Sequence, residues 1–264
     1  MRWYCTQNGA REHYAIPRAL KKSGKLGALF TEFWAGPQVR QFAFGPLKSA
    51  AARWHRDLAK GADGSGDPQI VSWNRQAIWR GLRSRLNAGR ENQYEVHIRS
   101  GRWFAEKVIG FLEMQRTNVR GSVVFSYDTT ALELFRWAKL RGAVCVLGQM
   151  DASRLEAELV CGEEKRWAGW ALQTTKIPEA FFLRREAEWC IADRIIVNSR
   201  WSFDSLIKQG VPAEKLVIIP LCYEANDPMT SRASAADILG DDPDGTPRPD
   251  CLRVLFLGQV ILGK

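Results

Sequence analysis

Short apolar runs rich in valine and isoleucine recur along this chain and most constrain its fold. VVF, VCVL, IIV and VLFL each stand between segments that have the spacing of amphipathic helices. Runs of this kind are typical of strands in a parallel sheet that helices cover on both faces. We therefore predict an α/β fold with a Rossmann-like, doubly wound parallel sheet.

The strands and helices of this sheet can be placed along the chain. We expect strands near Arg2–Thr6, Ala28–Thr31, Gln69–Ser72, Ser122–Tyr127, Ala143–Met150, Arg194–Asn198, Leu216–Pro220 and Arg253–Leu257. We expect helices at Tyr14–Lys22, Thr130–Arg141, Pro178–Ile191 and Trp201–Gln209. The glycines Gly24, Gly142 and Gly210 stand just past three of these helices, as helix stop signals do.

Acidic residues and prolines mark the stretch 227–251 as a linker or a long surface loop. Seven acidic residues lie between Glu224 and Asp250, together with four prolines and only two arginines. Such a composition does not bury a core. We predict a first domain over residues 1–226 and a linker over 227–251. Residues 252–264 are then the first strand of a second domain that the sequence contains only in part.

The composition excludes several classes of protein. The six cysteines form no C-x-x-C pair and there are three histidines, so we expect reduced thiols and no metal site. No apolar run has the length of a signal peptide or of a membrane-spanning helix, so we expect a cytoplasmic location. The net charge of +9 favours anionic partners. Recognised nucleic-acid motifs are absent, so we expect no nucleic acid among them.

Two glycine-containing segments match nucleotide-binding loops only in part. The end of the chain, Gly258–Lys264, has the spacing G-x-x-x-x-G-K of a phosphate-binding loop and follows a predicted strand. No serine, threonine or helix follows the lysine in the sequence, and Val-Ile-Leu poorly suits a loop whose amides bind phosphate. Gly61–Gly66 precedes a strand, and we interpret it as a surface loop. We therefore reject a nucleoside-triphosphatase and a nicotinamide or flavin dehydrogenase.

Polar residues follow the first predicted strand, where open α/β sheets bind their ligands. Gly9 lets a ligand approach the backbone, Arg11 can meet a phosphate, and His13 can act as a base or bond to a hydroxyl. The alternative interpretation is a polar loop that caps the helix beginning at Tyr14. The residues alone do not choose between the two.

Two aspartates occupy the same edge of the predicted sheet. Asp128 follows the strand SVVFSY and Asp151 follows VCVLGQM. Each can orient a sugar hydroxyl or accept a proton. The alternative for Asp128 is the N-cap of the next helix, and Asp151 has a similar alternative. We place Asp128 with His13 as catalytic candidates and Asp151 among the substrate-binding ones.

For the remaining candidate residues, a purely structural role is the alternative to a functional one. We place Ser199 and Arg200 among the substrate-binding candidates. The alternative for Ser199 is the N-cap of the helix after it, and Arg200 can reach an anion or lie exposed. The segment Arg75–Lys107 has eight Lys or Arg against three Glu. Its helix RQAIWRGLRSRL is basic and amphipathic, and such helices bind anionic membrane surfaces. The alternative is an ordinary solvated face over a core stripe.

Three blocks together resemble a known family. They are GAREHYAIPRAL, RREAEWCIADRIIVNSRWSFDSLIKQGVPAEKLVIIPL and LRVLFLGQVILGK. They resemble the retaining glycosyltransferases of family 4, which have the GT-B fold. The likeness covers most of residues 1–225 and resumes at 252, and residues 35–120 carry little of it.

The resemblance implies two Rossmann-like domains, of which the first binds a hydroxyl acceptor and the second a nucleotide-sugar donor, without a metal or other cofactor. It places Gly9 near the acceptor and the donor phosphates, with His13 and Tyr14 beside it. Lys264 matches the lysine that pairs with the donor diphosphate, where a cation stabilises the leaving group. Family members often have arginine where this chain has Gln259.

The sequence departs from the family in one larger respect. The E-x7-E motif that handles the donor lies downstream of the lysine in the family, and these 264 residues do not contain it. We expect that this polypeptide alone does not transfer sugar and that a complementing C-terminal chain would supply the missing half. The alternative is a non-catalytic module, from a split or decayed transferase, that binds a partner or ligand through an exposed strand at 253–257. We also expect peripheral contact with the inner membrane surface.

Overall fold

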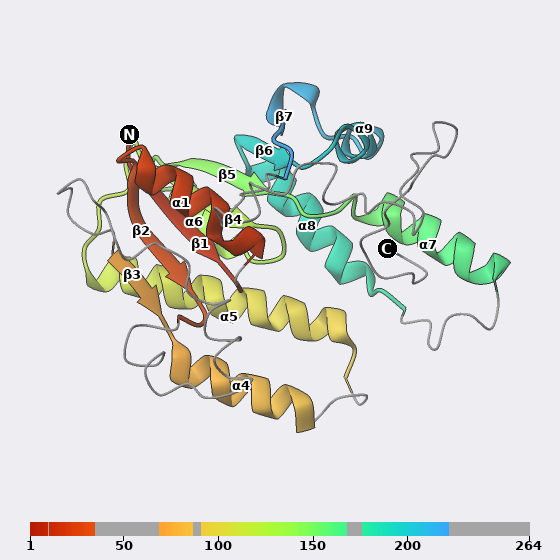
Figure 1. Cartoon of the computed structure of the whole chain (residues 1–264), viewed down its shortest axis with the longest axis horizontal. Helices are drawn as coiled ribbons and strands as arrows, with labels where there is room; N and C mark the ends of the chain where they lie inside the picture. Colours follow the sequence, from red (N-terminus) through yellow and green to blue (C-terminus); the bar gives the residue numbers. More distant parts are fainter. Residues whose placement is uncertain (10, 35–68, 87–90, 168–175, 222–264) are drawn as a thin grey trace, which may run out of the picture.

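The structure is a computed structural model, and it describes residues 1–9, 11–34, 69–86, 91–167 and 176–221 (Figure 1). Within these residues the chain forms one sheet of seven strands, all of them parallel, in the order β3-β2-β1-β4-β5-β6-β7. The strands are β1 (Trp3–Gln7), β2 (Leu26–Thr31), β3 (Gln69–Ser72), β4 (Val123–Tyr127), β5 (Val144–Gly148), β6 (Arg194–Val197) and β7 (Leu216–Ile218). The first seven predicted strands are confirmed.

Seven helices connect the described strands. They are α1 (Ala15–Lys22), α4 (Asn74–Leu86), α5 (Gln93–Met114), α6 (Leu132–Lys139), α7 (Arg154–Arg166), α8 (Glu179–Ile191) and α9 (Arg200–Lys208). Two short 3₁₀ turns, η1 (Arg11–Tyr14) and η2 (Ala213–Lys215), precede α1 and β7. The four helices predicted with bounds are confirmed, with ends that differ by up to two residues.

The core has two layers because neighbouring residues of each strand face opposite sides of the sheet. Phe30 and Val124 pack with α5, α6, α8 and α9 on one face. Their neighbours Leu29 and Phe125 pack with Tyr14 and α1 on the other. Helices thus cover both faces, and the Rossmann-like, doubly wound fold is confirmed.

The order of the strands contains one reversal. From β1 the chain moves outward through β2 to β3, then returns to form β4 on the other side of β1. β1 therefore pairs with both β2 and β4. At such a point the connections leave the two central strands in opposite directions and open a crevice at their carboxyl ends.

Several predictions fall outside the described residues. They are the linker 227–251, the partial second domain 252–264 with its strand Arg253–Leu257, and the loop Gly61–Gly66. Among the helices that the structure describes, none combines the length and the apolar character needed to cross a membrane.

Candidate functional site

A pocket of about 1050 Å³ lies at the carboxyl edge of the sheet, where the order of the strands reverses. Asn8 and Arg11 reach it from the end of β1, Asp128 from the end of β4, and Asp151 from beyond β5. Residues of α5, α7 and α8 form its other walls. Ligands of open α/β sheets bind at this position, so the pocket is the candidate site.

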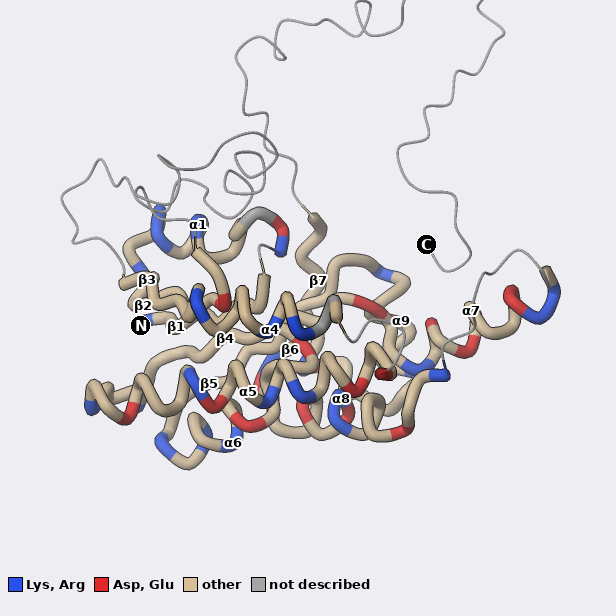
Figure 2. The backbone as a smooth tube through the Cα atoms, turned by 90° about the horizontal axis from the view of Figure 1, so that it is seen from below, with Lys and Arg blue, Asp and Glu red and all other residues tan. Residues whose placement is uncertain are grey.

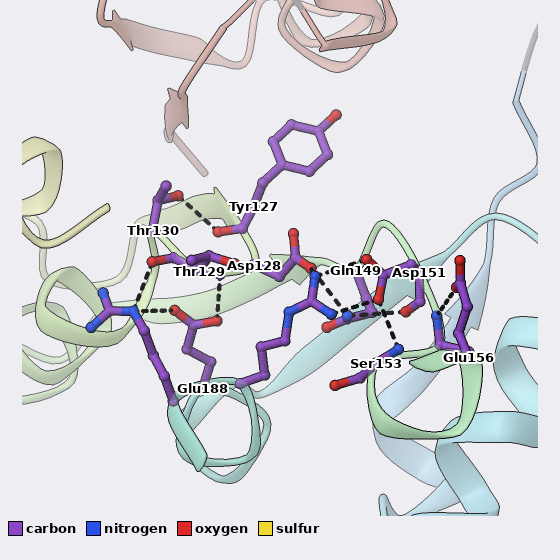
Figure 3. Close-up of polar contacts among 12 residues, drawn as sticks. Tyr127, Asp128, Thr129, Thr130, Gln149, Asp151, Ser153, Glu156 and Glu188 are labelled. Carbon is purple, nitrogen blue, oxygen red and sulfur yellow. Dashed lines mark hydrogen bonds and ion pairs between the residues drawn. The ribbon is translucent and has the colours of Figure 1, made fainter. Parts of the chain in front are cut away.

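Arg185 of α8 joins the two aspartates Asp128 and Asp151, which Figure 3 labels. Its Nη2 donates to Asp128 Oδ2 at 2.5 Å, and its Nη1 donates to Asp151 Oδ1 at 2.5 Å. The Asp128 side chain is 1% exposed and that of Arg185 is 6% exposed, whereas that of Asp151 is 38% exposed. The guanidinium thus fixes one buried carboxylate and leaves the other partly open to the pocket.

Gln149, just past β5, holds the same cluster from its other side. Its amide nitrogen donates to Asp128 Oδ2 at 3.1 Å and to the carbonyl of Asp151 at 3.0 Å. Its amide oxygen accepts a hydrogen bond of 2.8 Å from the indole of Trp189. The two carboxylates are therefore held by a hydrogen-bonded network that extends into the core.

The two carboxyl groups experience different environments. Complete burial raises the pKa of Asp128 above its ordinary value, although the charge of Arg185 opposes this. Burial also acts to raise the pKa of Asp151, but the hydrogen bond and charge of Arg185 outweigh it and the pKa lies below its ordinary value. Asp151 is thus the carboxylate that stays ionised and faces the pocket.

The structure corrects the interpretation of Asp128 as a helix cap. Ala131 stands at the N-cap of α6 and makes no side-chain cap. Glu188 of α8 takes this role instead, since its carboxylate accepts hydrogen bonds from the backbone N–H groups of Thr129, Ala131 and Leu132 at 2.8 to 3.1 Å. Asp128 therefore does not cap α6 and pairs with Arg185 instead.

Asp151 is not the N-cap of the next helix either, since Ser153 holds that position in α7, but it does bond to the turn before the helix. Its Oδ1 accepts a hydrogen bond of 2.7 Å from the N–H of Ser153, and Glu156 accepts one of 3.1 Å from the N–H of Ala152 (Figure 3). Ser153 has a φ of 55° and is 4% exposed. The turn that opens α7 is thus closed by two carboxylates on the pocket wall.

Among the site residues predicted in the loop after β1, Arg11 lines the pocket and Tyr14 lies in the core. Gly9 has a φ of 86°. Arg11 lies 3.8 Å from Asp128 Oδ1 and stacks over the ring of Tyr127 at 5.3 Å. Tyr14 has no exposed surface, packs edge-on against Trp34 and lies in the core. A contact of Tyr14 with substrate stays a prediction.

Among the other predicted residues that the structure describes, Ser199 and Arg200 do not line this pocket. The backbone of His13 belongs to η1, and its side chain lies outside the described part of the structure. Ser199 is the N-cap of α9 and accepts from the N–H of Ser202 at 3.1 Å, as predicted. Arg200 is exposed and pairs with Asp204 at 3.1 Å. Lys264 lies outside the described residues.

Arg185 and His97 belong to the pocket but were not predicted from the sequence. His97 lies in the first turns of α5, lines the pocket and packs edge-on against Tyr94. Burial, and then the charges of Arg11 and Arg185, lower its pKa, so the imidazole is neutral at pH 7 and can accept a proton. No motif marks either residue, and only the fold brings them beside Asp128.

The pocket wall also offers an aromatic surface. Tyr94 and Phe181 meet edge-on with their ring centres 4.9 Å apart, and Phe182 follows at 6.1 Å from Phe181. All three line the pocket beside the carboxylates. Within the described ranges no group of three or more His, Cys, Asp or Glu side chains is arranged to hold a metal ion. The site therefore combines hydrogen-bonding groups of both signs with apolar rings.

A search of protein-family models and of curated proteins finds no match to the sequence. Two solved structures of UDP-N-acetylglucosamine 2-epimerases are similar. One has 13% identity over 83% of this chain and 45% of its own, with a TM-score of 0.40. The other, from Rickettsia bellii, has 18% identity over 82% and 44%, with a TM-score of 0.39. The chain spans less than half the length of either structure.

Proposed function

We propose that residues 1–226 are the acceptor-side domain of a retaining glycosyltransferase with the GT-B fold. The complete enzyme would move a hexose from a nucleotide sugar to a hydroxyl acceptor. The bond from the anomeric carbon to the diphosphate breaks, a bond to the acceptor oxygen forms, and the hydroxyl proton passes to a base. The three sequence blocks that resemble family 4 support this proposal, and the assignment to that family rests on these blocks alone.

The observation that carries the proposal is the composition of the pocket at the strand reversal. Asp151, His97 and Arg11 offer an ionised acceptor, a neutral imidazole and a cation within one cavity. The rings of Tyr94 and Phe181 lie beside them. Carboxylates that accept from hydroxyls, next to aromatic faces that cover C–H groups, suit a sugar ring better than a planar or wholly apolar ligand.

The donor side of the proposal rests on the resemblance. Lys264 would pair with the diphosphate, and Gly9 would allow the phosphates to approach the loop after β1. The donor-binding motif of the family is absent from the sequence, so the proposal assigns acceptor binding, and not transfer, to this chain by itself.

Acceptor binding can be tested on the 264-residue chain by saturation-transfer NMR with methyl glucosides, galactosides and mannosides. We expect at least one hexoside to bind, and His97→Ala to weaken that binding about tenfold through the loss of one hydrogen bond. Arg102→Ala is the matched control, because Arg102 is an exposed residue of α5 outside the pocket lining. Failure of every hexoside to bind, or equal effects of the two variants, would contradict the proposal.

Transfer is tested separately. The chain is incubated with UDP-, GDP- and ADP-hexoses and the hexoside that binds, and release of the nucleoside diphosphate is measured. We expect none from the 264-residue chain. Turnover would show that this chain holds its own donor site and would overturn the assignment of donor binding to a further segment.

A further inference from the structure

Helix α4 exposes its apolar side. Ile78, Trp79, Leu82 and Leu86 are 53%, 69%, 49% and 81% exposed. At 3.6 residues per turn these four positions fall within an arc of about 100°. We call these four residues the α4 apolar face. A surface helix of a globular protein ordinarily turns such an arc toward the core, so this helix is inverted relative to the usual arrangement.

The inner side of α4 is the polar one. Arg80 is partly buried and lies over the ring of Trp103 of α5 at 4.4 Å. Burial and the charge of Arg99 lower its pKa, while the charge of Glu32 opposes this. Helix α4 therefore does have a core-facing side, and this side contacts α5 through the stacking of Arg80 on Trp103. The α4 apolar face is left directed away from the body.

The charge of α4 identifies what this face fits. The helix has four arginines and no acidic residue over 13 positions. It lies along the lower border of the molecule in Figure 1, and Figure 2 views this border from below. Arg75 and Arg83 are exposed. An isologous contact between two copies would set arginine against arginine, which opposes self-association. A flat anionic surface with an apolar interior satisfies both the charges and the rings.

We propose that α4 is a membrane-surface helix that inserts Trp79, Leu82 and Leu86 between anionic lipids while the exposed Arg75 and Arg83 pair with the headgroup phosphates. This inference does not depend on the proposed function, since it uses no residue of the pocket.

The test is flotation of the full chain with vesicles of phosphatidylcholine alone or mixed equally with phosphatidylglycerol. We expect binding to the mixed vesicles only, and loss of this binding at high salt. The double substitution Trp79→Ser, Leu82→Ser removes apolar surface and should weaken vesicle binding about tenfold or more. Both side chains are exposed, so the substitutions should leave the fold intact. Arg83→Gln should weaken vesicle binding about fivefold. The controls Trp201→Ser and Lys208→Gln, on α9, leave it unchanged.

Three results would overturn this inference. The first is no flotation with either vesicle. The second is flotation that the α4 and α9 variants reduce equally. The third is a concentration-dependent dimer, measured by sedimentation velocity without lipid, that the Trp79→Ser, Leu82→Ser variant abolishes, because the α4 apolar face would then pair two copies of the chain.

Discussion

Arg185 and Asp128 form a buried ion pair at the point where the order of the strands reverses, with 2.5 Å between Nη2 and Oδ2. The same guanidinium reaches Asp151, and its face lies over the ring of Phe181 at 4.6 Å. Two carboxylates that follow neighbouring strands are thus held by one cation from a helix 34 residues or more downstream. The pocket depends on this arrangement for its shape and for its charge.

Arg185→Gln should lower the free energy of unfolding by about 3–5 kcal/mol, because it removes the hydrogen-bonded countercharge of the buried Asp128 carboxylate and leaves only Arg11, which is partly exposed and 3.8 Å away. Urea denaturation of the full chain measures the loss. Arg154→Gln is the matched control: Arg154 pairs with the exposed Glu179, and loss of such a surface pair costs about 1 kcal/mol or less. Adding Asp128→Asn to Arg185→Gln should recover part of the stability. A loss for Arg185→Gln no larger than that of the control would contradict this account.

Glu188 makes stability depend on pH. Burial raises its pKa to about 8, against an ordinary value near 4.5. The folded state therefore holds a proton that the unfolded state releases, so this group's contribution to stability is present below about pH 4.5 and is lost as pH rises toward about 8. Its slope is at most about 1.4 kcal/mol per pH unit.

Glu188→Gln isolates this effect, because the amide does not titrate. We expect the wild-type free energy of unfolding to fall more steeply than that of the variant between pH 5 and pH 8, as measured by urea denaturation at each pH. Glu186→Gln, on the same helix and partly exposed, should keep the wild-type slope. Parallel curves for wild type and Glu188→Gln would show that Glu188 does not titrate in this range.

The strands could be predicted from the sequence because each is a short apolar run whose neighbours face opposite layers of the core. Capping at Ser199 could be predicted for a similar reason, since a serine bonds to an amide three residues away. The capping of α6 by Glu188 could not, because the donor and acceptor lie more than fifty residues apart. Only long-range packing of α8 on α6 brings them together.

Only part of the site could be predicted from the sequence, because some of its residues follow strands and others lie on helices that long-range packing brings to the pocket. Asp128 and Asp151 follow strands, so the parallel sheet alone places them at one edge. Arg185 and His97 lie on helices, where the sequence does not state which face meets the sheet edge. From the sequence, two adjacent arginines such as Arg184 and Arg185 are expected to be exposed to solvent, yet both residues are buried.

His97 should titrate below its ordinary pKa of 6.5, because partial burial and the positive charges of Arg11 and Arg185 disfavour the imidazolium. Arg11→Gln removes one of these charges and should raise the midpoint. The Cε1–H resonance of the imidazole, followed by NMR against pH, measures it. Arg200→Gln, on α9 and outside the pocket lining, should leave the midpoint unchanged. A midpoint that does not respond to Arg11→Gln would separate His97 electrostatically from the loop after β1.

Gly101 of α5 sets how closely this helix approaches the turn after β4. A Cβ at this position would lie 2.2 Å from the carbonyl oxygen of Thr129, which is backbone and cannot move aside easily. Thr129 itself has a φ of 70° and donates its N–H to Glu188. Gly101→Ala should therefore destabilise the fold by about 1–3 kcal/mol, as overpacking does.

Gly110 provides the control within the same helix. A Cβ there meets no atom within 4 Å, so Gly110→Ala should stabilise the protein by about 0.5–1 kcal/mol through helix propensity. The two substitutions make the same chemical change in α5, and thermal unfolding should give opposite signs for them. Equal signs would mean that α5 does not approach Thr129 so closely, and that the wall of the pocket formed by His97 and Tyr94 lies farther from Asp128.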